Sequence, residues 1–112
     1  MDREKLLDSD PILLRFYQNL KEVYKTLGAG FLENLSRLPA LNDLITDRWE
    51  RAKILGFGEG TNIYDNSLVI GSVKVGSECW IGPNTILDGS GSLSIGNFCT
   101  ISAGVQIYTH DN

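Results

Sequence analysis

The sequence predicts an α+β chain in which a helical N-terminal region, residues 1–53, is followed by a region of repeated short strands, residues 54–112. Apolar residues recur at spacings of three and four in the first region, as they do along one face of a helix. In the second region they recur at a spacing of six, with polar turn residues between them. This change of period divides the chain into its two parts.

The longest helix is predicted to begin at Asp10 and Pro11, because Asp followed by Pro is typical of an N-cap and a first helical residue. Gly28 and Gly30 are expected to end it, since glycine is frequent just past a helix C-terminus. The apolar positions between these ends indicate a packing face rather than a ligand site. They are Leu13, Phe16, Tyr17, Leu20, Tyr24 and Leu27.

Two further helical stretches are predicted before the repeats. One begins near Phe31 and is interrupted around Pro39. The other covers Asn42 to Lys53, and Gly56 stands beyond its end. The helical region carries no motif as specific as the repeats that follow.

The second region has an aliphatic residue at every sixth position. The series takes one step of eight, which indicates a two-residue insertion near Gly89 to Ser92. Its members are Ile63, Val69, Val75, Ile81, Leu87, Ile95, Ile101 and Ile107. The residue two places before each of them is mostly small or medium, as expected for a second inward position on a strand. Each repeat is therefore a short strand followed by a corner.

Two segments of this region, VGSECWIGPNTIL at 75–87 and IGNFCTISAGVQIYTHDN at 95–112, resemble the hexapeptide-repeat acyltransferases, in particular the sugar O-acetyltransferases. The resemblance covers residues 57–112. It implies a short left-handed parallel β-helix of about three coils, in which three hexapeptides form one triangular coil. The left hand follows from the resemblance alone, because the general preference for right-handed crossovers favours the opposite hand.

The coil implied by the resemblance predicts which residues lie above one another. With about 18 residues per coil and the insertion taken into account, two columns result: Ile63, Ile81 and Ile101, and Val69, Leu87 and Ile107. Cys79 then lies directly beneath Cys99. Adjacent strands, about 4.8 Å apart, are within reach of a disulfide, but these two side chains project in parallel and are expected to be buried free thiols.

His110, the only histidine, stands three residues after Ile107, at a corner of the last coil. Its context, GVQIYTHDN, matches that of the general base of the sugar O-acetyltransferases, so the resemblance implies this role for His110. Imidazole is suited to it, because it is available as a neutral base, accepts the hydroxyl proton and returns it to the departing thiolate. The predicted function is O-acetyl transfer from acetyl-CoA, as co-substrate, to a hydroxyl of a sugar or glycan.

Two other polar residues have both a functional and a structural interpretation. Asp111 either orients the imidazole or is a turn residue. Asn84, at the equivalent corner one coil below, either contacts the acceptor or serves the turn. The coenzyme-binding residues are not predicted, because residues 56–112 hold one base, Lys74, against five acids.

Composition limits the partners and the location. The net charge is −4 and nearly all Lys and Arg residues lie in the helical region, which excludes a nucleic-acid partner. The two cysteines lack the neighbouring ligands of a zinc site, so no metal is predicted. No apolar stretch reaches the roughly 18 residues of a membrane span, and the N-terminus does not resemble a secretory signal. We therefore expect a cytoplasmic protein.

The chain ends two residues after His110, whereas the enzymes of the family continue for several coils that hold the coenzyme. We therefore expect residues 1–112 to be the N-terminal part of a longer acyltransferase, with a β-helix that is incomplete at its C-terminus. The alternative function is that of a non-catalytic, truncated β-helix that serves in oligomerisation or interaction.

An apolar stripe is predicted on the outside of the coils. It consists of Leu68, Ile70, Ile86 and Tyr108. Such a stripe is rarely left in water. It is covered either by the N-terminal helices or by neighbouring copies in the homotrimer that the resemblance implies for the full-length protein.

Overall fold

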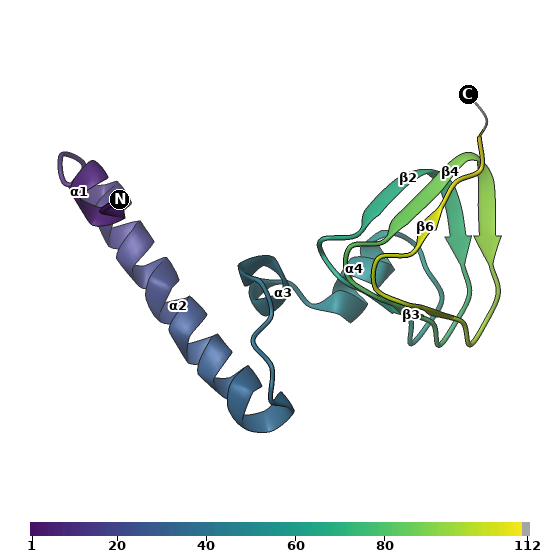
Figure 1. The fold of residues 1–112 in the computed structure, drawn as a ribbon, viewed down its shortest axis with the longest axis horizontal. Helices are drawn as coiled ribbons and strands as arrows, with labels where there is room; N and C mark the ends of the chain where they lie inside the picture. Colours follow the sequence, from purple (N-terminus) through teal and green to yellow (C-terminus); the bar gives the residue numbers. More distant parts are fainter. Residues whose placement is uncertain (111–112) are drawn as a thin grey trace. The chain divides into compact units, whose positions relative to one another are not determined.

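The computed structural model describes residues 1–110 and divides into two compact units, Met1–Ile45 and Thr46–Asn112. Helices make up the structured part of the first unit, and all the described strands belong to the second (Figure 1). The strands form two parallel sheets. The predicted order of a helical region before a strand region is therefore confirmed, and the chain is α+β.

Helix α2 (Pro11–Leu35) is the main element of the first unit and follows the short helix α1 (Arg3–Leu6). The Asp10 side chain accepts a hydrogen bond of 3.1 Å from the Leu13 backbone N–H, and Pro11 occupies the first helical turn. This confirms the predicted start, because a carboxylate at the N-cap satisfies a backbone donor that the helix itself leaves free. Within residues 1–110, no helix combines the length and the apolar character needed to cross a membrane.

The predicted end of α2 at Gly28 and Gly30 is wrong, because the helix continues to Leu35. A glycine inside a helix costs only about 1 kcal/mol relative to alanine, which neighbouring helix formers offset. Gly28 is buried instead, and a Cβ atom there would lie 2.8 Å from Cδ1 of Leu38. The glycine thus makes room for the segment that follows the helix. The helix ends at Ser36, in the left-handed conformation with φ of 55°.

The helix predicted over residues 42–53 is two helices, α3 (Leu41–Ile45) and α4 (Arg48–Ile54). Asp47 separates them, because its side chain accepts hydrogen bonds from the backbone N–H groups of Trp49 and Glu50 and caps α4. An aspartate in this position competes with helix continuation and favours a new start.

The six strands of the second unit form two three-stranded parallel sheets with the orders β1-β3-β5 and β2-β4-β6. Strands β1 (Asn62–Ile63), β3 (Trp80–Ile81) and β5 (Thr100–Ile101) form the first sheet. Strands β2 (Leu68–Val75), β4 (Ile86–Ile95) and β6 (Gln106–Ile107) form the second. Successive coils of the chain overlap in the view of Figure 1, because they are stacked on one another.

The strand register confirms both predicted columns. Ile63 pairs with Ile81, which pairs with Ile101, and Val69 pairs with Leu87, which pairs with Ile107. The predicted insertion is confirmed as well: Gly71 pairs with Gly89, but Val73 pairs with Leu93, so the register shifts by two residues between them. The two extra residues widen one corner of the second coil.

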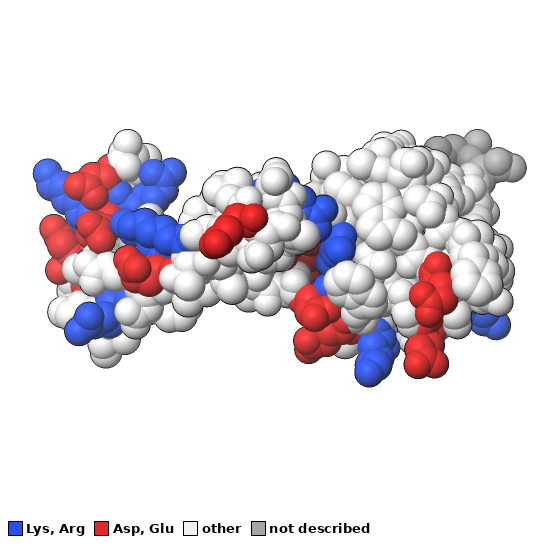
Figure 2. Space-filling view, turned by 90° about the horizontal axis from the view of Figure 1, so that it is seen from below, with Lys and Arg blue, Asp and Glu red and all other residues white. Residues whose placement is uncertain are grey.

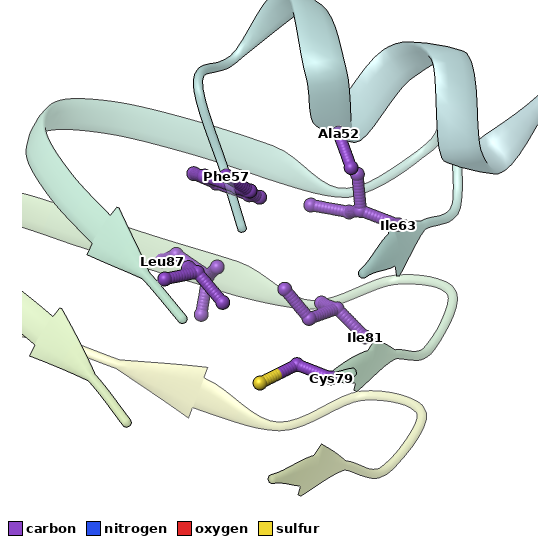
Figure 3. Close-up of a cluster of buried hydrophobic side chains, with 7 residues drawn as sticks. Ala52, Phe57, Ile63, Cys79, Ile81 and Leu87 are labelled. Atoms are coloured by element: carbon purple, nitrogen blue, oxygen red, sulfur yellow. The ribbon is translucent and has the colours of Figure 1, made fainter. Parts of the chain in front are cut away.

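The core of the second unit lies inside the coils. Ile63, Ile81 and Leu87 have no exposed surface, and Cys79 is 1% exposed (Figure 3). All eight aliphatic residues of the six-residue series belong to this core or pack against it. Burial of a full aliphatic side chain contributes about 1.5–3 kcal/mol, so this series accounts for much of the stabilisation of the stack.

Helix α4 covers the first coil. Ala52 is 1% exposed and lies in the core cluster (Figure 3). The Arg51 guanidinium donates hydrogen bonds of 2.8 Å to the carbonyl oxygens of Tyr64 and Ser67 and lies 3.6 Å from a carboxylate oxygen of Asp65. One planar guanidinium thus connects the helix to a corner of the first coil.

Candidate active site

His110 lies three residues beyond the end of β6, in a segment that is hydrogen-bonded through Thr109 to a corner of the coil below. Its Nδ1 atom is 2.6 Å from Oδ2 of Asp88, a residue of β4. The Asp88 side chain is 3% exposed, whereas that of His110 is 41% exposed. A carboxylate buried to this degree needs partners for both of its oxygens. His110 partners one of them and itself remains accessible.

Ser90 donates hydrogen bonds to the other carboxylate oxygen of Asp88. The Ser90 backbone N–H donates a hydrogen bond of 2.8 Å to Oδ1, and the Ser90 hydroxyl donates a second bond to the same atom. These bonds hold the pKa of Asp88 below its ordinary value, and the nearby His110 lowers it further, while burial acts in the opposite direction. Asp88 is therefore ionised at neutral pH and its orientation is fixed.

Thr109 fastens the backbone before His110 to the widened corner. Its hydroxyl donates a hydrogen bond of 2.7 Å to the carbonyl oxygen of Asp88 and accepts one of 2.8 Å from the N–H of Gly91. The approach is close, since a Cβ atom on Gly91 would lie 2.2 Å from the carbonyl oxygen of Thr109. The inserted residues thus build the corner to which the His110 segment is attached.

Tyr108 is the aromatic neighbour of His110. The two ring centroids are 6.0 Å apart with the planes at 90°, an edge-to-face contact. The Tyr108 hydroxyl donates a hydrogen bond of 3.3 Å to Oε1 of Gln106, and the side chain is more than half exposed. Tyr108 therefore presents an aromatic surface beside the imidazole.

Asn84 lies in a different corner and makes bonds of another kind. It has φ of 57°, its Oδ1 accepts a 2.9 Å hydrogen bond from Asn66, and its backbone N–H donates one of 3.2 Å to Oδ1 of Asn66. Its side-chain oxygen and backbone thus serve the stacking of two corners, and among residues 1–110 no hydrogen bond joins Asn84 to His110. Contact with an acceptor stays a prediction for Asn84. Asp111 lies outside the described residues.

The two cysteines are free thiols, as predicted, and lie in adjacent coils. Cys79 is buried, and its Sγ accepts a 3.4 Å hydrogen bond from the backbone N–H of Cys99. Cys99 is only partly buried, so the prediction of a buried thiol is confirmed for Cys79 alone. Both side chains belong to the core of the stack and lie apart from the contacts of His110.

Asp88 was not among the residues selected from the sequence, although two signals mark it. It is the only Asp, Glu, Lys or Arg between Cys79 and His110. It also follows Leu87 directly, and Leu87 pairs with Ile107, so the predicted columns already bring Asp88 to the level at which the His110 segment begins. The path of the chain after Ile107, which the repeat does not specify, brings the two side chains together.

The geometry supports proton transfer at one atom. Because Nδ1 of His110 faces the carboxylate, Nδ1 carries a proton and Nε2 is left as the accepting nitrogen.

Among the described residues, no group of three or more His, Cys, Asp or Glu side chains could hold a metal ion. No protein-family model and no curated protein matches this chain.

Proposed function

We propose that this chain is an O-acetyltransferase in which His110 is the general base and the acceptor is a hydroxyl of a sugar or glycan. The observation that carries the proposal is the pairing of Nδ1 of His110 with Asp88, because it leaves Nε2 available to accept a proton. The parallel strands, their register and the context of His110 in GVQIYTHDN support a hexapeptide-repeat enzyme with a left-handed parallel β-helix.

The proposed reaction uses one proton acceptor and no acyl-enzyme. Nε2 of His110 removes the proton of the acceptor hydroxyl as its oxygen attacks the thioester carbonyl of acetyl-CoA. The carbon–sulfur bond then breaks, and the protonated imidazole returns the proton to the departing thiolate. Asp88 is a positioning residue, because its carboxylate holds Nδ1–H and stabilises the positive charge that forms on the imidazole.

The proposal includes acetyl-CoA as co-substrate, a homotrimer as the assembly and a cytoplasmic location. Lys74 is the single Lys or Arg between residues 56 and 112, so these repeats lack the cations that would hold the coenzyme phosphates, and no coenzyme-binding residue is assigned. The exposed outer residues Leu68 and Ile70 support assembly, because exposed apolar side chains of this kind favour contact with another protein surface.

An assay of acetyl transfer from acetyl-CoA to a panel of sugars tests the proposal, with the release of free thiol as the measured signal. We expect His110→Gln to lower kcat by roughly 10²- to 10⁴-fold, because glutamine keeps a donor for Asp88 but supplies no base. Phe98→Ala, a change at an exposed corner of the same unit, is the control and should leave kcat unchanged. Equal activity of wild type and His110→Gln would contradict the assignment of the base.

A second candidate function is a non-catalytic β-helix that oligomerises or binds a partner. The apolar stripe of Leu68, Ile70, Ile86 and Tyr108, in which only Ile86 is partly buried, favours it. Calorimetric titration of coenzyme A into the chain distinguishes the two functions. Micromolar affinity supports the enzyme, whereas the absence of binding together with a stable oligomer supports the interaction module.

A further inference from the structure

The position of Tyr108 limits what reaches His110. Nδ1 of His110 is occupied by Asp88, so a hydroxyl group must approach Nε2. Tyr108 stands next to the imidazole at a centroid distance of 6.0 Å and is 53% exposed. The molecule that carries the hydroxyl therefore extends past a large aromatic side chain.

The Tyr108 ring is held in place by its own surroundings. Its hydroxyl donates to Gln106, and the edge-to-face contact with His110 fixes the ring plane relative to the imidazole. A ring restrained in this way loses little side-chain entropy when a ligand packs on it. The negative face of an aromatic ring attracts the weakly positive C–H groups of a neighbouring molecule, and pyranose rings carry such groups on one face.

Charge around the site favours an uncharged molecule. Asp88 is the only Asp, Glu, Lys or Arg between residues 79 and 110, and it is ionised beside His110. An anionic acceptor would meet a buried carboxylate with no Lys or Arg in this stretch to offset it. Charged side chains are also sparse over the strand unit on the face shown in Figure 2.

We propose that the acceptor is an uncharged pyranoside whose C–H face packs against Tyr108, which makes Tyr108 the residue that selects the acceptor. This inference rests on the proposed acetyl transfer and specifies its substrate class. It separates neutral glycosides from sugar phosphates and nucleotide sugars, which share the pyranose ring but carry negative charge.

Steady-state kinetics with methyl glycosides and the matching sugar phosphates test this inference. We expect Tyr108→Ala to raise the KM for the methyl glycoside by roughly 3- to 10-fold, with kcat and the KM for acetyl-CoA nearly unchanged. Tyr108→Phe keeps the ring but loses the hydrogen bond to Gln106, so its acceptor KM should lie between those of wild type and Tyr108→Ala. Phe98→Ala, at an exposed corner of the same unit, is the control and should leave both KM values unchanged. A preference of the wild type for sugar phosphates, or a Tyr108→Ala variant with an unaltered acceptor KM, would overturn the inference.

A ligand-binding measurement separates failure of this inference from failure of the proposed function. If the wild type transfers no acetyl group to any acceptor, the proposed function fails. Saturation-transfer NMR with a methyl glycoside then decides the sugar contact alone. Saturation transfer to the sugar ring protons that is present in wild type and lost in Tyr108→Ala would support the contact between the sugar and Tyr108. Absence of saturation transfer in wild type would overturn it.

Discussion

Nδ1 of His110 lies 2.6 Å from Oδ2 of Asp88, although more than one coil of sequence separates the two residues. Stacking brings them together, because β4 carries Asp88 and β6, directly above it, leads to His110. The contact joins a buried carboxylate, fixed by Ser90, to an accessible imidazole. The charge state of one residue therefore sets the tautomer of the other.

The first prediction concerns Asp88→Asn. Its amide would donate to Nδ1, which moves the imidazole proton to Nε2 and removes the accepting atom, so kcat should fall roughly 10²- to 10⁴-fold. His110 is the only histidine, so the ¹⁵N NMR signals of its ring report the tautomer directly. Asp65→Asn makes the same chemical change at the corner bound by Arg51 and should preserve both kcat and the NMR signals. An unaltered tautomer in Asp88→Asn would refute the positioning role.

The second prediction concerns stability in acid. The pKa of Asp88 is lowered in the folded chain, so the carboxylate stabilises the fold fully above the unfolded-state pKa of about 3.9. That contribution is lost as the pH falls through the lower, folded-state pKa. We expect the urea midpoint of the wild type to drop across this range and that of Asp88→Asn to drop less. The fluorescence of Trp49 and Trp80, both in the second unit, provides the measurement. Parallel pH profiles of the two proteins would contradict this linkage.

The strand unit was the more predictable part of the fold. A six-residue period places one aliphatic side chain inward per strand, and a residue such as Ile81 has few alternatives once its neighbours in the column are fixed. The helix ends were less predictable. Gly28 carries the signal of a helix stop, but its role is set by a side chain, Leu38, that packs on it from outside the helix. Such tertiary contacts override local propensity.

The candidate site was predictable only in part. The context of His110 identified it, whereas its partner Asp88 depends on how the chain leaves β6. Thr109 determines that path through two hydrogen bonds to the widened corner. Neither bond follows from a six-residue period, because the corner departs from the period by two residues.

The third prediction concerns the core. Ile81 has no exposed surface, so Ile81→Ala should lower the free energy of unfolding of the second unit by about 2–5 kcal/mol through lost burial and a cavity. Ile54→Ala is the same change at a residue that is 79% exposed in the same unit and should alter it by at most about 0.5 kcal/mol. Urea unfolding followed by tryptophan fluorescence compares them. Equal losses would mean that the inward column does not form the core.

The fourth prediction concerns Gly91, where the inserted corner meets the His110 segment. A Cβ atom here would lie 2.2 Å from the carbonyl oxygen of Thr109, so Gly91→Ala must push two backbone segments apart and should cost about 1–3 kcal/mol. The movement also breaks the hydrogen bond from the Gly91 N–H to the Thr109 hydroxyl. Because His110 follows Thr109 in the chain, loss of this bond displaces His110 from Asp88.

Gly96→Ala is the matched control for Gly91→Ala, because a Cβ atom at Gly96 meets no atom within 4 Å. We expect the Gly91 variant to lose both stability and kcat, and the Gly96 variant to lose neither. The His110 ¹⁵N signals should shift toward those of Asp88→Asn only in the Gly91 variant, because displacement from the carboxylate frees Nδ1. If Gly91→Ala loses stability but keeps the wild-type imidazole signals, then the corner supports the coil alone and Thr109 does not position His110.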